Sequence, residues 1–360
     1  MENLLNDIYK KVNTGQRLSK EDGIRLFQSN DLLTIGEMAN LVRERLNGKD
    51  AYFIINRHIN YTNICENRCR FCAYSKNKGE KGAFTLTIDQ IMEKAKGCDK
   101  NGVKELHIVG GLNPEIPFEY YLEMLSKLHS AFPQVNLQAF TAVEIYYFAR
   151  RANLSLEKVL SQLKQAGLTS IPGGGAEVFS PRVRKVICPK KIEGKLWLEV
   201  METAHKLGLK SNATILYGHI ETIEERVDHI LALRELQDKT FGFKSFIPLA
   251  YHPENTELSG VGTTGYQDLK TLAISRLLLD NFPHIKAFWI MLGVKLAQVS
   301  LSFGVDDLDG TVVEEKITHC AGAKTPQELS KKELVNLITE SGRIPVERDS
   351  IYNRVVSYQV

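Results

Sequence analysis

The stretch "INYTNICENRCRFCAYS" (residues 59–75) places three cysteines within eight residues, at Cys65, Cys69 and Cys72. Thiolates are ligands that suit zinc ions and iron–sulfur clusters. A structural zinc site needs four closed ligands, and the next cysteine, Cys98, falls in the middle of a predicted helix. Three thiolates instead fit a four-iron cluster with one iron left open, and an open iron can bind a substrate. A zinc knuckle or an adventitious cluster is the alternative.

Outside this stretch the chain alternates between short apolar, β-rich runs and amphipathic helical segments. Capping-box patterns at 87–90, 222–225 and 325–328 indicate where helices begin. Eight repeats of strand and helix predict an α/β fold, a parallel (β/α)₈ barrel of TIM type, with a doubly wound open sheet as the alternative. The predicted strands are residues 51–62, 104–111, 135–143, 168–175, 211–218, 244–252, 285–292 and 297–304.

The two ends of the chain do not follow this alternation. Residues 1–50 are predicted to form a helical N-terminal extension, and residues 310–360 a C-terminal helical cap with a tail. Residues 51–309 then form the barrel. No low-complexity linker separates these parts, so we expect one domain with additions at both ends.

Composition argues against several classes of protein. The 46 basic and 43 acidic residues are mixed along the chain and give a formal charge of +3. This balance is unlike that of a nucleic-acid binder or a membrane-surface protein. The N-terminal segment is charged throughout, unlike a signal peptide, and no apolar run predicts a membrane span. Six cysteines, three clustered and three scattered, fit a reducing cytoplasm and one metal site.

Glycines and carboxylates follow several predicted strands, at the barrel edge where catalytic groups gather. Gly110 and Gly111 end the second strand, where a missing side chain lets the backbone approach a ligand; a simple tight turn is the alternative. Glu144 and Glu177 follow the third and fourth strands. For both, a solvated loop position or a helix N-terminal charge is the alternative.

Cationic and hydrogen-bonding residues at later strand ends are further candidates. Arg182 and Arg184 match the geometry of a carboxylate on an anionic substrate, although a solvated helix start fits them equally well. The remaining strand-end candidates are His219, His252 and Asn255.

The CxxxCxxC spacing, with Phe71 just before the third cysteine, resembles the signature of the radical S-adenosylmethionine (SAM) enzymes. The resemblance implies a [4Fe-4S] cluster on the three cysteines, with SAM chelating the open iron and being cleaved to a 5′-deoxyadenosyl radical. It also implies that the glycine pair binds the methionine amino group and that a carboxylate holds the ribose hydroxyls. The cofactor-binding residues implied in this way are Phe71, Gly110, Gly111, Glu177 and Tyr217.

Longer motifs are similar to the aminofutalosine synthases, radical SAM enzymes of the futalosine route to menaquinone. They include "HIVGGL" (107–112), "FTAVEI" (140–145), "LAYHPEN" (249–255) and "DDLDGTVVEEK" (306–316). The resemblance implies that the adenosyl radical adds to 3-[(1-carboxyvinyl)oxy]benzoate, so that SAM is consumed as a co-substrate. The alternatives are the dehypoxanthine futalosine cyclase, a deazaflavin (FO) synthase subunit, and a non-enzymatic iron–sulfur electron-transfer protein.

The implied reaction assigns roles to the strand-end residues. An aromatic dicarboxylate substrate suggests that Arg182, Arg184 and Asn255 bind it. The catalytic candidates are Glu144, His219 and His252. A reductase with a flavodoxin or ferredoxin is expected as electron donor, and neither nucleic acid nor membrane as partner.

Overall fold

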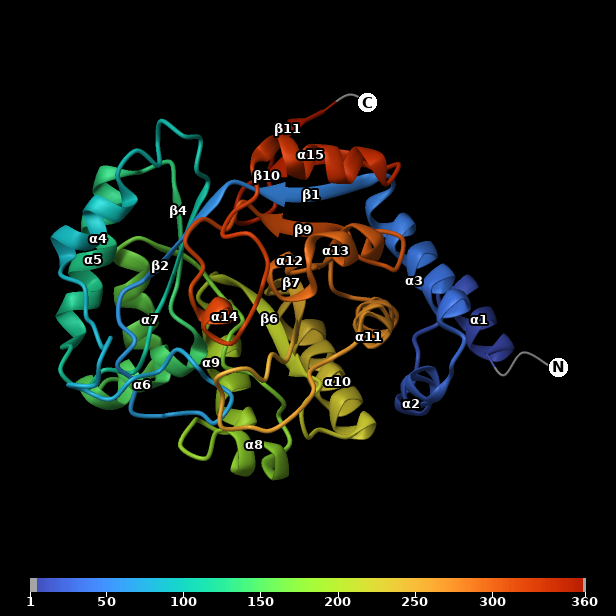
Figure 1. The fold of residues 1–360 in the computed structure, drawn as a ribbon, viewed down its shortest axis with the longest axis horizontal. Helices are drawn as coiled ribbons and strands as arrows, with labels where there is room; N and C mark the ends of the chain where they lie inside the picture. Colours follow the sequence, from blue (N-terminus) through green and yellow to red (C-terminus); the bar gives the residue numbers. More distant parts are fainter. Residues whose placement is uncertain (1–4, 359–360) are drawn as a thin grey trace.

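A computed structural model of the chain describes residues 5–358. Its main element is a curled sheet of seven parallel strands in the order β2-β3-β4-β5-β6-β7-β8, with helices on its outer side (Figure 1). The strands are β2 (Asn56–Asn60), β3 (Glu105–Val109), β4 (Asn136–Ala139), β5 (Leu168–Ile171), β6 (Lys210–Tyr217), β7 (Phe243–Ala250) and β8 (His284–Ile285).

The eighth barrel position is filled by β9 (Asp307–Gly310). Isolated parallel bridges join Lys286 to Asp307 on one side and Arg57 to Val313 on the other, so this segment lies between β8 and β2. The prediction of an eight-stranded parallel barrel is therefore confirmed. The polar sequence of β9 explains why periodicity did not reveal it as a strand.

A second sheet, in the order β11-β10-β1-β9, shares β9 with the barrel wall. It contains β1 (Asp50–Ile54), β10 (Ile344–Arg348) and the antiparallel edge strand β11 (Arg354–Ser357). The predicted strand 51–62 is thus two strands in different sheets. Because β10 pairs with β1, the end of the chain returns to the start of the barrel.

Two strand predictions near residue 290 are wrong. Residues 285–292 contain only the end of β8, followed by the helix α12 (Trp289–Leu292). Residues 297–304 do not form a strand, because most of this stretch continues the helix α13 (Val294–Ser300) and a turn. The buried side chains of Ala297 and Leu301 are four residues apart, which is helical spacing.

Two of the three predicted helix starts are confirmed. Thr87 and Thr222 cap their helices through capping boxes with Gln90 and Glu225. The third prediction, at 325–328, is wrong, because a second pattern five residues later, with Ser330 as the N-cap, starts the helix instead. Both sequences match the capping-box pattern, so the start of the helix depends on tertiary packing rather than on the pattern alone.

Helices surround the barrel and extend beyond it at the N-terminus (Figure 1). Residues 5–50 are largely helical, and residues 310–358 combine two helices with β10 and β11. The other helices are α1 (Asn6–Asn13), α2 (Lys20–Gln28), α3 (Leu32–Asn47), α4 (Ile88–Ala95), α5 (Phe118–Ala131), α6 (Ala142–Ala152), α7 (Leu156–Gln165), α8 (Pro181–Ile187), α9 (Gly194–Lys206), α10 (Ile223–Thr240), α11 (Gly265–Leu278), α14 (Ile317–Cys320) and α15 (Lys331–Glu340).

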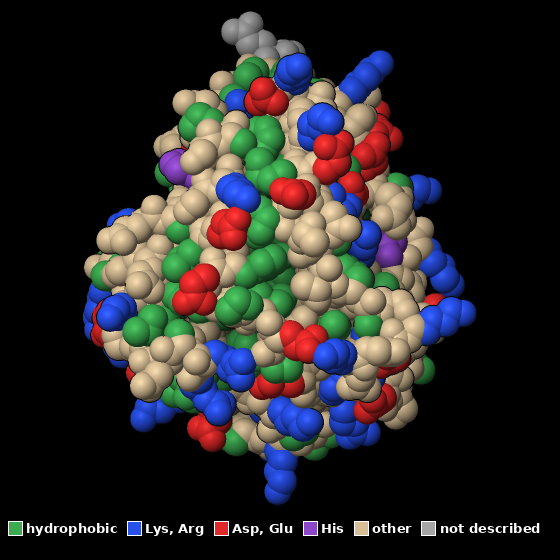
Figure 2. Space-filling model, turned by 90° about the vertical axis from the view of Figure 1, so that its left-hand side faces the viewer, with side chains coloured by type: hydrophobic (Ala, Val, Ile, Leu, Met, Phe, Trp, Pro, Cys, Tyr) green, Lys and Arg blue, Asp and Glu red, His purple; other side chains and the backbone are tan. Residues whose placement is uncertain are grey.

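The surface is mixed in charge where Figure 2 shows it. Basic and acidic side chains alternate on this face, with basic ones more frequent toward its lower edge and apolar ones along its middle. Within residues 5–358, no helix is both long and apolar enough to cross a membrane.

Candidate functional site

The three clustered cysteines lie in the loop after β2, at the carboxyl end of the barrel strands. Backbone hydrogen bonds hold this loop on several sides: the Cys65 amide donates to the Lys76 carbonyl (3.1 Å), and the Arg70 amide donates to the Ile187 carbonyl of α8 (2.9 Å). The Glu66 amide reaches the Leu112 carbonyl after β3 (3.1 Å). The loop is therefore anchored to two other parts of the barrel rim.

All three thiols line one cavity of about 340 Å³ inside the barrel mouth. Cys69 is buried, and Cys65 and Cys72 are half-buried. Among the described residues, no three His, Cys, Asp or Glu side chains converge closely enough to hold one metal ion. A four-iron cluster held by these cysteines would take one thiolate on each of three irons and leave the fourth iron open. A donor set of three soft thiolates matches that requirement.

Gly111 is required by the close packing of the cysteine loop. A Cβ atom there would overlap the Ile64 carbonyl oxygen and lie 2.8 Å from its carbonyl carbon and 2.9 Å from the Cys65 Cβ. A Cβ on Gly110 would lie 2.6 Å from the Tyr61 ring. Both glycines line the cavity, as predicted for a ligand site. The missing side chain of Gly111 lets the cysteine loop approach the end of β3, and that of Gly110 makes room for the Tyr61 ring.

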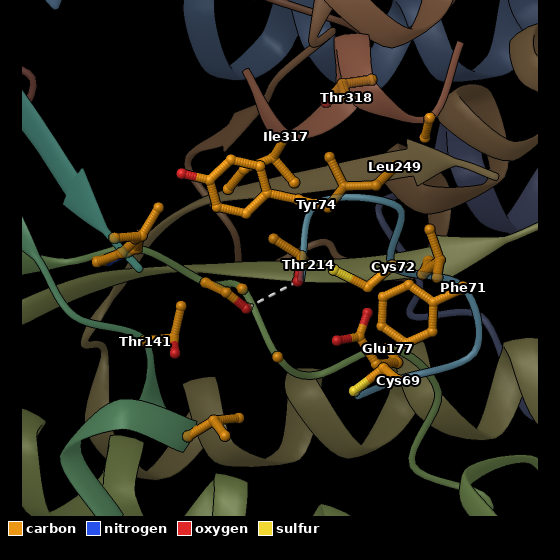
Figure 3. A pocket seen from close by; sticks show the side chains of 18 of the residues that line it. Cys69, Phe71, Cys72, Tyr74, Thr141, Glu177, Thr214, Leu249, Ile317 and Thr318 are labelled. Carbon is orange, nitrogen blue, oxygen red and sulfur yellow. Dashed lines mark hydrogen bonds between the residues drawn. The ribbon is translucent and has the colours of Figure 1, made fainter. Parts of the chain in front are cut away.

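Glu177 and Lys191 form a buried ion pair beside the cysteines. The Lys191 Nζ atom lies 2.7 Å from the Glu177 Oε1 atom and 5.0 Å from the centre of the Phe71 ring. All three side chains line the cavity, and Figure 3 shows Phe71, Glu177, Cys69 and Cys72 on one side of it. Burial opposes the charge on Lys191, but the neighbouring Cys69 and Glu177 outweigh this and raise its pKa.

Glu144 lines the same cavity, but its carboxylate is fully engaged. One oxygen accepts from the Tyr61 hydroxyl (2.6 Å) and the Gly110 amide (3.1 Å). The other accepts from the Thr141 amide and hydroxyl (both 2.8 Å), which completes the capping box of α6. Burial raises the pKa of Glu144, and these hydrogen bonds oppose that shift. The arrangement gives Glu144 a positioning role, because it holds the β3 glycine and the start of α6 together.

His252 lines the cavity, whereas His219 and Tyr217 do not. The His219 ring is buried against its own turn, with Nε2 3.0 Å from the Leu216 carbonyl and Nδ1 accepting from the Ile220 amide (2.6 Å). The Tyr217 hydroxyl donates to Asp268 of α11 (2.7 Å). Tyr217 points outward because alternation along β6 aims Leu216 and Thr214 inward, and His219 lies in the turn after the strand.

The three predicted substrate-binding residues also lie outside the cavity. Arg182 is exposed and paired with Glu225 (2.6 Å). Arg184 is buried and donates to main-chain carbonyls around the glycine loop, including that of Ala176 (2.6 Å). The Asn255 amide donates to the Cys320 carbonyl (3.0 Å). The three predictions are not supported, because each side chain already serves a local protein contact.

Sequence reasoning missed the polar floor of the cavity. Its members come from within four barrel strands, from the residue after β8 and from β9, where predicted strand ends gave no reason to look. The floor residues are His58, His107, Gln138, Asn212, Lys286 and Asp309. A signal was present in the sequence, because polar side chains at inward positions of a barrel strand are unusual.

Comparisons with known proteins identify the family of the chain. The model of the radical SAM superfamily matches residues 59–233, and that of the CofH/MqnC C-terminal region matches residues 240–358. Methylornithine synthase (PylB) has the same fold, with a TM-score of 0.74, 17% identity, and coverage of 94% of this chain and 97% of that one.

Curated relatives are similar over nearly their whole length. The chain is 50% identical to the aminodeoxyfutalosine synthase of Thermus thermophilus, over 97% of this chain and 95% of the relative. It is 44% identical to that of Streptomyces coelicolor (99% and 95%). It is 38% identical to a 5-amino-6-(D-ribitylamino)uracil–L-tyrosine 4-hydroxyphenyl transferase of Methanosarcina mazei (99% and 92%). The chain therefore belongs to the aminodeoxyfutalosine synthase family within the radical SAM superfamily, whose enzymes use a [4Fe-4S] cluster and SAM.

Proposed function

We propose that this protein joins the adenosyl group of SAM to 3-[(1-carboxyvinyl)oxy]benzoate and forms 6-amino-6-deoxyfutalosine for menaquinone biosynthesis. The adenosyl C5′ bonds to the vinyl carbon, the aryl group moves from oxygen to carbon, and carbon dioxide and methionine leave. The observation that carries this proposal is the 50% identity to a named aminodeoxyfutalosine synthase over nearly both chains.

In this proposal Cys65, Cys69 and Cys72 each bind one iron of the cluster. The reduced cluster and SAM, when bound, supply the 5′-deoxyadenosyl radical. The chain's task is then to orient and shield the reactants. Glu177 and Lys191 stand beside the cysteines as polar neighbours for the bound cofactor, and the main chain of the 173–175 glycine loop faces the same cavity.

The cavity wall supplies the shielding that such a reaction needs. Apolar side chains from β7 and from the segments after β8 and β9 face the cysteines across the cavity (Figure 3). They suit an aromatic ring, and they keep water from a reactive intermediate. The residues concerned are Leu249, Phe288, Met291 and Ile317. The proposal includes a cytoplasmic location and a flavodoxin or ferredoxin, with its reductase, as electron donor.

The competing function is that of the tyrosine transferases. Their names state L-tyrosine and 5-amino-6-(D-ribitylamino)uracil as substrates, and they are 37–40% identical to this chain. The difference in identity, 50% against at most 40% among these relatives, favours the synthase.

The test is a pair of parallel incubations. The anaerobically reconstituted enzyme receives dithionite and SAM, with either the enol-ether benzoate or the tyrosine and ribitylaminouracil pair, and product masses are read. We expect an adenosyl adduct that has lost carbon dioxide in the first incubation only. Free 5′-deoxyadenosine without an adduct, or coupling of tyrosine in the second incubation, would overturn the proposal.

A further inference from the structure

The floor of the cavity is a layer of polar side chains in register on neighbouring strands. His58 of β2 pairs with His107 of β3, which pairs with Gln138 of β4. The two imidazole rings stack, with centres 4.4 Å apart. Lys286, which follows β8, reaches Asp309 of β9 with its Nζ atom 2.8 Å from Oδ1. These side chains come from several neighbouring strands, and together they line the deep end of the cavity.

The hydrogen bonds around Gln138 determine which ring nitrogen of His107 carries the proton. The Gln138 Oε1 atom accepts from the buried Lys244 ammonium (2.6 Å) and from the Asn212 amide (3.3 Å), so the Gln138 amide must present its NH₂ group to His107. The His107 Nδ1 atom, 3.2 Å away, then accepts. Burial lowers the pKa of His107 to about 4, so the ring is neutral and its proton lies on Nε2.

The floor also contains polar groups that the protein leaves without partners. His58 is 8% exposed, lines the cavity, and its Nε2 atom has no hydrogen-bond partner. The Lys286 ammonium has three hydrogens, and Asp309 is the one partner described for it. A buried polar atom without a partner costs free energy unless a ligand satisfies it. The unpartnered His58 atom therefore points to a bound polar group.

These groups select the chemistry of that ligand. Lys286 and His107 offer hydrogen-bond donors only, and the neutral His58 ring can add a third. The charge of Asp309 is offset by its ion pair with Lys286. A carboxylate, with two oxygens that accept hydrogen bonds, matches a floor of donors. A cation would meet the Asp309 carboxylate, but that group already holds the Lys286 ammonium.

We propose that this polar floor is a subsite for the carboxylate of an aromatic acid. It lies four residues deeper along β3 than Gly111 beside the cysteine loop, or roughly 13 Å at about 3.3 Å per residue. An aryl ring spans much of that depth and would stand against the apolar wall. Identification of the acid as the benzoate end of the substrate rests on the proposed function; the subsite itself does not.

The experiment measures binding without turnover. Holoenzyme with SAM, but without reductant, is titrated calorimetrically with 3-hydroxybenzoate and with its neutral analogue 3-hydroxybenzamide. We expect the wild type to prefer the acid by at least about tenfold, the value of one charge-assisted hydrogen bond. Absence of this preference, or absence of binding, would overturn the proposal.

Two variants locate the effect. His58→Phe removes the unpartnered nitrogen while keeping a ring on His107. Lys286→Met is combined with Asp309→Asn, so that no buried carboxylate loses its counter-ion. Each should reduce the preference for the acid to within about twofold of unity, with iron content unchanged. A variant that folds, loads iron and keeps the full preference would overturn the assignment of its side chain.

Lys331→Met combined with Glu347→Gln is the matched control. Lys331 also pairs with a buried carboxylate, that of Glu347 (2.6 Å), but it lies on α15 outside the cavity. We expect the preference for the acid to stay at the wild-type value; its loss would mean that the effect is not local to the floor. Because the probe cannot form an adduct, this test can succeed even if the enol-ether benzoate gives no product.

Discussion

Replacing Gly111 with alanine tests whether the cysteine loop is held by close packing against β3. The added methyl would meet main-chain atoms of Ile64, which cannot rotate away as a side chain can. Overpacking of this kind costs typically about 1–3 kcal/mol, and main-chain contact favours the upper part of that range. Unfolding entropy scales with length, so about 3 kcal/mol lowers the melting temperature of this chain by roughly 4 °C.

We expect Gly111→Ala to impair cluster loading more severely than it lowers the melting temperature. Moving the Ile64 carbonyl displaces the neighbouring Cys65, so we expect iron content and visible absorbance after reconstitution to fall severalfold. The assay pairs calorimetric melting of the apoprotein with iron analysis of the reconstituted protein. Gly260→Ala is the control, since the nearest atom to its Cβ is 3.5 Å away. Wild-type iron content and melting temperature in Gly111→Ala would refute the packing argument.

Three further predictions concern the cluster, acid stability and a buried arginine. Cys69→Ala should abolish cluster absorbance and SAM cleavage, and SAM cleavage that survives in the purified variant would contradict the ligand assignment. Burial lowers the pKa of His58 to about 4 and that of His229 to about 3, so both are neutral in the folded state. The unfolded chain takes up these protons first as the pH falls below about 6.5, so stability is complete above that pH and declines toward pH 4 by up to roughly 3 kcal/mol for each group. Urea midpoints that do not change between pH 6.5 and 5 would contradict this. Arg184→Met removes donors to several main-chain carbonyls, and should lower the melting temperature while leaving the KM for the aryl substrate unchanged. A raised KM at unchanged stability would return Arg184 to the substrate site.

Much of the active site was predictable because its signals are local. The three cysteines need only a short loop after a strand, so their spacing predicted their joint position on one cavity. Strand and helix alternation predicted the barrel, since each unit follows its own periodicity. Gly110 and Gly111 were singled out because they end a predicted strand, whereas Phe71 and Glu177 were named as cofactor-binding residues from the family resemblance.

Residues whose direction depends on register were not predictable. Alternation allows one of Arg57 and His58 to face the barrel interior, but it does not say which. The structure turns Arg57 outward to the Lys94 carbonyl of α4 (2.7 Å) and His58 inward. The direction of Tyr217 on β6 was equally open, and the structure turns its side chain away from the cavity. Arg182 was engaged by Glu225, a partner 43 residues away in the chain.

The sequence by itself determined the class of fold and the cluster loop, because short-range periodicity and spacing carry that information. Only the tertiary structure decided that 51–62 divides between two sheets, that β9 completes the barrel, and that Lys286 pairs with Asp309 while His58 stacks on His107. These choices depend on which distant segments pack together and which partners they leave for each polar side chain. The free energy of such long-range contacts, rather than any local preference, placed the polar floor beneath the cysteines.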